Sequence, residues 1–201
     1  MSPVVRHPAL PFALSWSGSP AEAHPDGAAL TITAPARTDL FVDPGGAEPL
    51  LNAPCLLGIA PHGDFQLSAR VTVEFGQTYD AGVLLAWYDE RHWAKLCFER
   101  SPQDKPMAVS VVTRGMSDDA NAFTVDGRTL WLRISRLGSA LAFHASTDGT
   151  RWELVRYFAL DATAELSLGF LAQSPLGEGC TATFAEIGYL PKSLSDLRDG
   201  S

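Results

Sequence analysis

The sequence comprises 201 residues, of which 46% are hydrophobic and 19% charged, with a formal net charge of −8. A chain of this length can bury a core without disulfides or metals, so we expect one domain over residues 1–192 and a flexible polar tail over residues 193–201. The 15 Lys and Arg residues are scattered, which argues against a nucleic acid or an anionic membrane as partner. The first residues do not resemble a secretion signal and no run of about 20 apolar residues occurs, so a cytoplasmic location is predicted.

Cysteine and histidine residues give no sign of a disulfide, a metal site or a cofactor. Cys55, Cys97 and Cys180 are far apart, form no C-x-x-C pair and lie in apolar or strand-like segments. They are therefore predicted to be buried, reduced packing residues. The five histidines have no partner at i+2 or i+4, and no phosphate-binding glycine motif occurs. We expect no metal and no cofactor.

Alternation of apolar and polar residues predicts β-strands through most of the chain. After a Pro-rich entry, strands are expected at residues 29–34 and 55–59. The clearest pattern runs from Phe65 to Phe75, where every second residue is apolar. Such a period of two places one apolar face against a core and one polar face toward solvent.

Residues 81–88 are continuously apolar, which predicts a central strand covered on both faces. A turn at residues 89–91 connects it to a strand at 92–99, so the two are expected to form a hairpin. Further strands are predicted at residues 107–113, 130–136, 141–146, 152–156, 166–172 and 181–189.

No window of the sequence sustains a capped helical period. The many short strands exceed what one twisted sheet usually holds, since open sheets rarely exceed about 10 strands. The sequence therefore predicts an all-β fold, a two-sheet antiparallel sandwich.

Two sequence blocks carry a family resemblance. LRISRLG at residues 132–138 and AFHASTDGTRW at residues 142–152 resemble the hairpin of concanavalin A-like lectin/glucanase sandwiches. Over residues 10–190, the chain is similar to an uncharacterised family of that superfamily that is named for a regulation-of-enolase protein. The resemblance implies a jelly-roll β-sandwich, a fold that often binds glycans. After Ser117-Asp118, related sequences often carry a tryptophan, whereas this chain has Asp119-Ala120.

The best candidate site follows from the register of the strand at 92–99. Trp93, Lys95 and Glu99 point away from the face that carries Leu96 and Phe98. Aromatic faces stack against sugar rings, and charged groups satisfy sugar hydroxyls, so this mixture suits a carbohydrate. The remaining predicted ligand-binding residues are Trp87 on the adjoining strand and, at the rim, Asp39, Arg114, Asp118 and Gln173. We expect Asp39, Lys95, Glu99 and Gln173 to converge in one pocket.

Several interpretations stay open at this stage. Lys95 and Glu99 could be solvated charges on an exposed face, where an ion pair stabilises by only about 0–1 kcal/mol, and Trp87 could be a core residue. The sequence predicts a lectin-like module that binds a carbohydrate or another polyhydroxylated small molecule. One alternative is a regulatory domain that binds a protein partner without catalysis. Another is a glycoside hydrolase, although the E-x-D-x-x-E motif typical of sandwich glucanases is absent.

Overall fold

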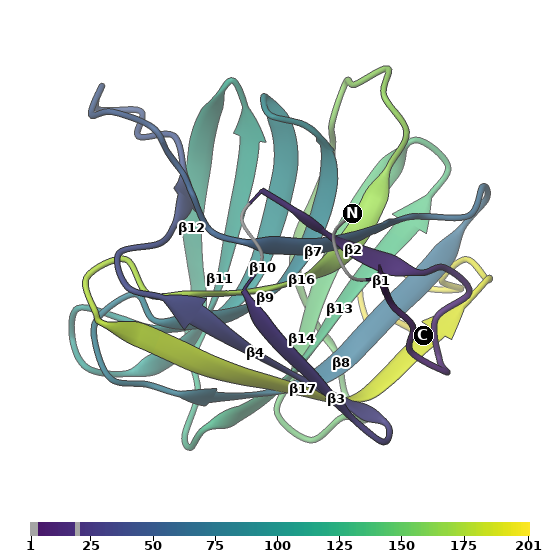
Figure 1. Cartoon of the computed structure of the whole chain (residues 1–201). Helices are drawn as coiled ribbons and strands as arrows, with labels where there is room; N and C mark the ends of the chain where they lie inside the picture. The colour runs from purple at the N-terminus through teal and green to yellow at the C-terminus, as the bar shows by residue number, and fades with distance from the viewer. Residues whose placement is uncertain (1–3, 19–20) are drawn as a thin grey trace.

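The computed structural model describes residues 4–18 and 21–201, which form two antiparallel β-sheets packed as a sandwich (Figure 1). Sheet A has the order β1 (Val4–Val5), β2 (Leu14–Ser17), β7 (Cys55–Ile59), β16 (Ser167–Gln173), β9 (Ala81–Asp89), β10 (His92–Arg100), β11 (Pro106–Arg114) and β12 (Met116–Thr124). Sheet B has the order β15 (Glu153–Ala159), β14 (Ala140–Ser146), β13 (Thr129–Leu137), β8 (Phe65–Glu74), β17 (Gly179–Leu190), β4 (Ala29–Pro35) and β3 (Glu22–Asp26). A two-stranded ribbon consists of β5 (Leu40–Phe41) and β6 (Leu50–Leu51).

The predicted all-β class and the antiparallel two-sheet sandwich are confirmed, and the described residues contain no helix. Whether the arrangement is a jelly roll stays a prediction. The hairpin expected around residues 89–91 is present, since β9 and β10 pair along their length.

The main core lies between the two sheets. Along β8 the alternating residues from Phe65 to Val73 are completely buried and belong to one apolar cluster. Leu96 and Phe98 of β10 enter the same cluster from sheet A. Because apolar burial stabilises by about 25 cal/mol per Å², this shared layer is the main source of stability.

Sheet A carries a second apolar layer on its outer face. This layer contains Leu85 of β9 together with Trp93 and Cys97 of β10. Leu84, the neighbour of Leu85, faces the main core instead. Strand β9 is therefore covered on both faces, as its continuous apolar sequence predicts.

Residues 38–42, which we call the strap, cross the outer face of sheet A. At one end Thr38 forms an antiparallel bridge with Ser174, directly after β16. At the other end Val42 exchanges hydrogen bonds with Ser117 of β12, both at 2.9 Å. Between these anchors Leu40 is buried in the second apolar layer. The strap thus covers part of sheet A and leaves a hollow beside it.

The three cysteines are free and buried, as predicted. Burial raises the pKa of the Cys55 and Cys180 thiols to about 12, and it also raises the pKa of Cys97. Thiols of this kind remain protonated and pack as small apolar groups.

The C-terminal segment 191–201 lies against sheet B. The His144 Nε2 atom is 2.8 Å from the carbonyl oxygen of Leu197, and Gly200 is buried against His144 and Trp152. Leu194 is also buried. These contacts connect the segment to β14, while the mobility of residues 193–201 stays a prediction that hydrogen exchange can test.

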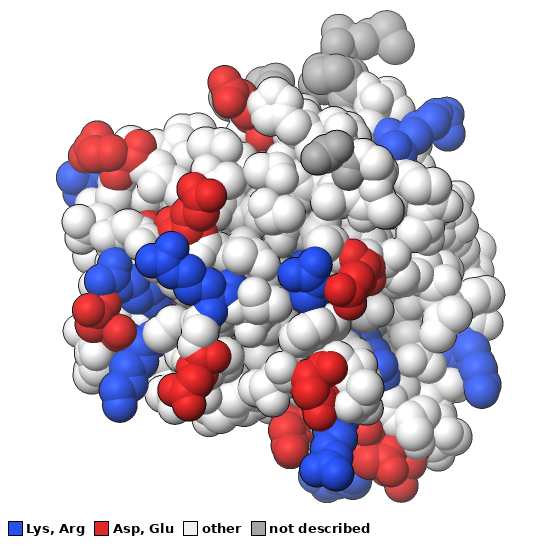
Figure 2. All heavy atoms as spheres, turned by 90° about the horizontal axis from the view of Figure 1, so that it is seen from below, with Lys and Arg blue, Asp and Glu red and all other residues white. Residues whose placement is uncertain are grey.

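Charges of both signs are mixed on the face of the molecule seen from below (Figure 2). Opposite charges also pair across neighbouring strands of sheet B, as Arg70 does with Glu186 at 2.7 Å. None of the described residues belongs to a helix that could cross a membrane.

Candidate functional site

A hollow of about 260 Å³ lies between the strap and sheet A, and we call it the strap pocket. Its lining combines charged, amide, aromatic and aliphatic side chains from six separate parts of the chain: Asp39, Phe41, Tyr79, Lys95, Glu99, Val111, Asp119 and Gln173. Four of the predicted site residues, Asp39, Lys95, Glu99 and Gln173, therefore line one pocket, as expected from sequence.

Lys95 is the central group of the strap pocket. Its side chain is only 2% exposed, and its ammonium donates hydrogen bonds to Asp39 Oδ1 at 3.1 Å and to Gln173 Oε1 at 2.9 Å. Burial alone would lower its pKa, but the neighbouring acidic groups, Asp39 foremost, outweigh burial and raise it. Lys95 is thus a buried cation, and the interpretation of Lys95 as a solvated surface charge is wrong.

Asp39 is held in place by the backbone around it. Its main-chain N–H donates to Asn52 Oδ1 at 2.9 Å, and its carbonyl accepts from the N–H groups of Asn52 and Ala53. Its carboxylate also accepts the N–H of Leu40 at 2.7 Å. The strap therefore presents this carboxylate to Lys95 in a fixed orientation.

Gln173 and Tyr79 form one wall of the pocket. The Gln173 amide accepts from Lys95 and donates through Nε2 to the Tyr79 carbonyl at 3.3 Å, so both of its ends are oriented. Tyr79 has a positive φ of 69° and a 39% exposed side chain. A bulky residue with positive φ is uncommon and is retained where the surrounding structure fixes it. Its main-chain N–H donates to the Arg100 carbonyl at 2.8 Å, which fixes the turn.

Glu99 and Asp119 approach Lys95 from neighbouring parts of sheet A. Val111 of β11 pairs with Lys95 on one side and with Asp119 on the other, which places Asp119 in the same cross-strand row as Lys95. Burial raises the pKa of Glu99 to about 8, and Lys95 opposes this shift. Burial likewise raises the pKa of Asp119. Near neutral pH, Glu99 is therefore partly a neutral acid that can both donate and accept a hydrogen bond.

Replacing Glu99 by glutamine is expected to remove a pH dependence of stability. Between pH 4.5 and about 8 the native state holds a proton on Glu99 that the unfolded chain has lost. The free energy of unfolding should therefore fall as pH rises through this range, by up to about 1.4 kcal/mol per pH unit from this group. Urea unfolding from pH 4 to 9 should show Glu99→Gln equal to the parent at acid pH and more stable at pH 9. The exposed Glu90→Gln is the matched control, and parallel curves for Glu99→Gln and the parent would contradict the assignment.

The other predicted site residues lie outside the lining of the strap pocket. Trp93 is fully buried, stacks on Trp87 at 6.4 Å and has an indole N–H without a partner among the described groups. Trp87 is half-buried and faces a separate groove formed with β2 and β7. Arg114 donates to the Ala159 carbonyl at 2.7 and 3.1 Å. Asp118 pairs with Arg156 at 2.7 Å. Arg114 and Asp118 thus connect the edge of sheet A to β15, and any contact of these residues with a ligand stays a prediction.

Sequence reasoning missed four lining residues: Phe41, Tyr79, Val111 and Asp119. Asp119 lies on β12, an edge strand with mostly exposed residues and therefore no apolar alternation to reveal it. Phe41 lies on the strap and Tyr79 lies in a loop. In such segments no alternation of apolar and polar residues indicates which way a side chain points. The one feature of the sequence that could have marked Asp119 as a site residue is its presence where similar sequences often have tryptophan.

The sequence of the chain matches a family model over residues 16–192, and the model describes a protein of unknown function, DUF1349. The chain belongs to the DUF1349 family. No curated protein matches this DUF1349 sequence. A link to enolase regulation stays a prediction.

Solved structures share the fold of this DUF1349 protein. A functionally unknown protein from Saccharomyces cerevisiae is 24% identical, with a TM-score of 0.79 over 88% of this chain and 95% of the yeast chain. The carbohydrate-binding module CBM66 from Bacillus subtilis is 16% identical, with a TM-score of 0.55 over 87% of this chain and 94% of the module. A GH43 protein from Bacillus licheniformis is 13% identical, with a TM-score of 0.64 over 82% of this chain but only 33% of its own. At these identities the likeness shows the sandwich fold alone.

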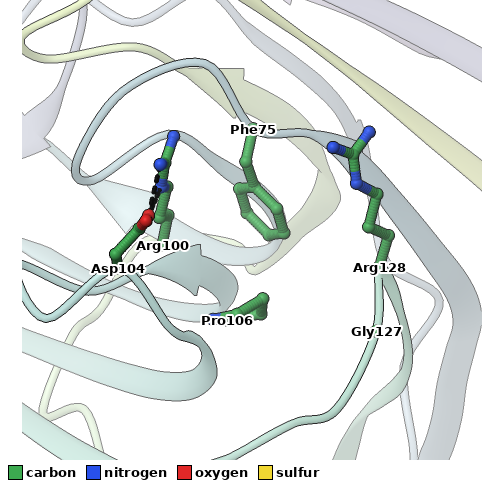
Figure 3. Close-up of a pocket in the computed structure, with 6 residues that line it drawn as sticks. All are labelled: Phe75, Arg100, Asp104, Pro106, Gly127 and Arg128. Carbon is green, nitrogen blue, oxygen red and sulfur yellow. Dashed lines mark hydrogen bonds and ion pairs between the residues drawn. The ribbon is translucent and has the colours of Figure 1, made fainter.

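A different hollow of the DUF1349 protein, about 310 Å³ in volume, lies around Phe75 (Figure 3). Arg100 and Arg128 lie on either side of the Phe75 ring, and Arg100 is paired with Asp104. Arg128 and Asp104 are exposed. None of the described polar residues that line this hollow is buried, so the strap pocket is the better candidate. Among the described residues, no group of three His, Cys, Asp or Glu side chains could hold a metal ion.

Proposed function

We propose that the strap pocket binds a polyhydroxylated small molecule, with carbohydrates as the first class to test. One observation carries the proposal: an unused donor and an unused carboxyl group face the same hollow. The Lys95 ammonium has three N–H groups and two acceptors, and no residue that the structure describes donates to the Glu99 carboxyl. A hydroxyl group accepts and donates at once, so neighbouring hydroxyls of one sugar ring can satisfy both residues.

The walls of the pocket support the same proposal. Phe41 and Tyr79 supply aromatic faces of the kind that pack against the C–H groups of a sugar ring. The volume of about 260 Å³ is at the small end of the range for ligand pockets. The Bacillus subtilis carbohydrate-binding module has the same kind of sandwich, which is a further reason to test carbohydrates first.

Calorimetric titration of the full chain with a panel of neutral and amino mono- and disaccharides tests this proposal. We expect at least one sugar to bind, and Glu99→Ala to weaken that binding about tenfold, since a buried hydroxyl group left without its hydrogen-bond partner costs about 1–3 kcal/mol. Glu90→Ala, on the exposed turn between β9 and β10, is the matched control and should bind like the parent. Failure of every sugar to bind, or equal binding by Glu99→Ala, would overturn the proposal.

Glycoside hydrolysis is the second candidate, because the carboxyl groups of Asp39, Glu99 and Asp119 meet in the strap pocket from three segments. A Glu99 pKa of about 8 suits a general acid at neutral pH. Turnover of nitrophenyl glycosides that is lost in Glu99→Gln would favour hydrolysis over simple binding.

The regulatory alternative predicts a flat hydrophobic surface and no polar pocket. The strap pocket is a polar hollow, so its presence favours a small ligand over a protein partner. The cytoplasmic location stays part of the proposal.

A further inference from the structure

Carboxyl groups outnumber cationic groups in the strap pocket. Asp39, Glu99 and Asp119 line it, and among the described residues Lys95 is the one cation in the lining. The Lys95 ammonium is already engaged by Asp39 at 3.1 Å and by the neutral Gln173 amide at 2.9 Å. Lys95 therefore neutralises the charge of the Asp39 carboxylate directly. The pocket carries excess negative charge whenever Glu99 or Asp119 is ionised.

The arginines near this part of sheet A are occupied elsewhere. Arg114 donates to the Ala159 carbonyl, Arg156 pairs with Asp118 at 2.7 Å, and Arg100 pairs with Asp104. Arg156 is close enough to Asp119 to lower the pKa of its carboxyl group, but its ion pair is with Asp118, and none of these three arginines lines the pocket. A bound cation is the simplest group that could complete the charge balance, because the pocket has space for one and its described lining holds no cation besides Lys95.

The raised pKa values of the Glu99 and Asp119 carboxyl groups agree with this shortage of positive charge. Burial is the largest cause of the raised pKa of Glu99, and the neighbouring Asp119 and Asp39 carboxylates raise it further. Burial and the Asp39 carboxylate also raise the pKa of Asp119. An ammonium group placed between them would favour the ionised form of both.

Resting on the proposed function, we infer that the ligand carries a cationic amino group, so the strap pocket selects amino sugars or similar amino polyols over neutral and acidic analogues. The ammonium of the ligand lies against the Glu99 and Asp119 carboxylates, where it forms charge-assisted hydrogen bonds. A hydroxyl group of the ligand accepts the remaining N–H of Lys95, and the C–H groups of its ring pack against Phe41 and Tyr79. An acidic sugar meets the same carboxylates with like charge and is rejected.

Matched probes separate this inference from the proposed function. The full chain is titrated at neutral pH with the 2-amino sugar, the neutral parent sugar and the uronic acid of the gluco, galacto and manno series. Within the series that binds, we expect the amino sugar to bind at least tenfold more tightly than the neutral sugar, and the uronic acid at least tenfold more weakly. The double variant Glu99→Gln, Asp119→Asn keeps the size of both side chains and removes their charge, so it should bind the amino and neutral sugars with similar affinity.

The outcomes are distinct. A neutral sugar that binds as well as its amino counterpart overturns the inference and leaves the proposed function intact. An amino preference that persists in the double variant also overturns it, because the preference then arises elsewhere. If no member of any series binds, the proposed function fails and the inference fails with it. Glu90→Gln serves as the control for removing one acidic group outside the pocket.

Discussion

Replacing Lys95 by methionine is expected to lower the free energy of unfolding by about 3–5 kcal/mol at pH 8, which is the usual cost of removing one partner of a buried ion pair. Lys95 is 2% exposed and Asp39 is 15% exposed. Methionine fills a similar volume, so the loss reports on the charge and not on a cavity. The Asp39 carboxylate and the Gln173 amide would each lose the hydrogen bond from Lys95 in a largely buried position, and Asp39 would keep only the Leu40 N–H as a donor among the described residues.

Chemical denaturation at pH 8 and pH 5 would measure this effect. The destabilisation should be smaller at pH 5, because carboxyl groups without a cation have raised pKa values and take up protons. The double variant Lys95→Met, Asp39→Asn should recover part of the loss, since it removes the uncompensated charge. Lys105→Met, at an exposed loop position, should change stability by no more than about 0.5 kcal/mol. A fully stable Lys95→Met would mean that the pair does not contribute to the fold.

Replacing Gly169 by alanine is expected to lower the free energy of unfolding by about 3 kcal/mol, through overpacking of backbone against backbone. A Cβ atom at Gly169 would lie 1.9 Å from the Leu56 carbonyl oxygen and 3.0 Å from the Leu57 Cα atom. Both atoms belong to the backbone of β7, so no side-chain rotation can relieve the overlap. Strands β7 and β16 would have to move apart, and β16 leads directly to Gln173 and the strap anchor at Ser174.

Gly188→Ala in β17 is the matched control for this prediction. There the nearest atom to an added Cβ is Ser68 Oγ at 3.5 Å, which is an ordinary contact. This variant should remain within about 1 kcal/mol of the parent, because the chief effect is on the entropy of the unfolded chain. Thermal and urea unfolding of both variants would decide the matter, and a Gly169→Ala protein as stable as Gly188→Ala would contradict the packing argument.

Much of the fold follows from local pattern. The alternation from Phe65 to Phe75 predicts β8 and its buried face. The unbroken apolar sequence at residues 81–88 predicts a strand that is covered on both faces. The alternation within residues 92–99 places Lys95 and Glu99 on the face opposite Leu96 and Phe98. Strand β12 was missed because an edge strand needs no buried residues on either face, so its sequence carries no period.

The sequence by itself therefore determined the class of fold, most of its strands and the face of β10 that carries the charged residues, because side-chain alternation is a property of each strand alone. Only the tertiary structure decided that this face is covered by the strap, that Lys95 is buried and that Asp119 and Tyr79 join Asp39 and Gln173 around it. These residues are far apart in the chain, and the pairing of distant strands that unites them leaves no local trace in the sequence. The electrostatic character of the pocket, including the raised pKa of Glu99, arises from that burial and from those neighbours, so it could not be predicted from residue types.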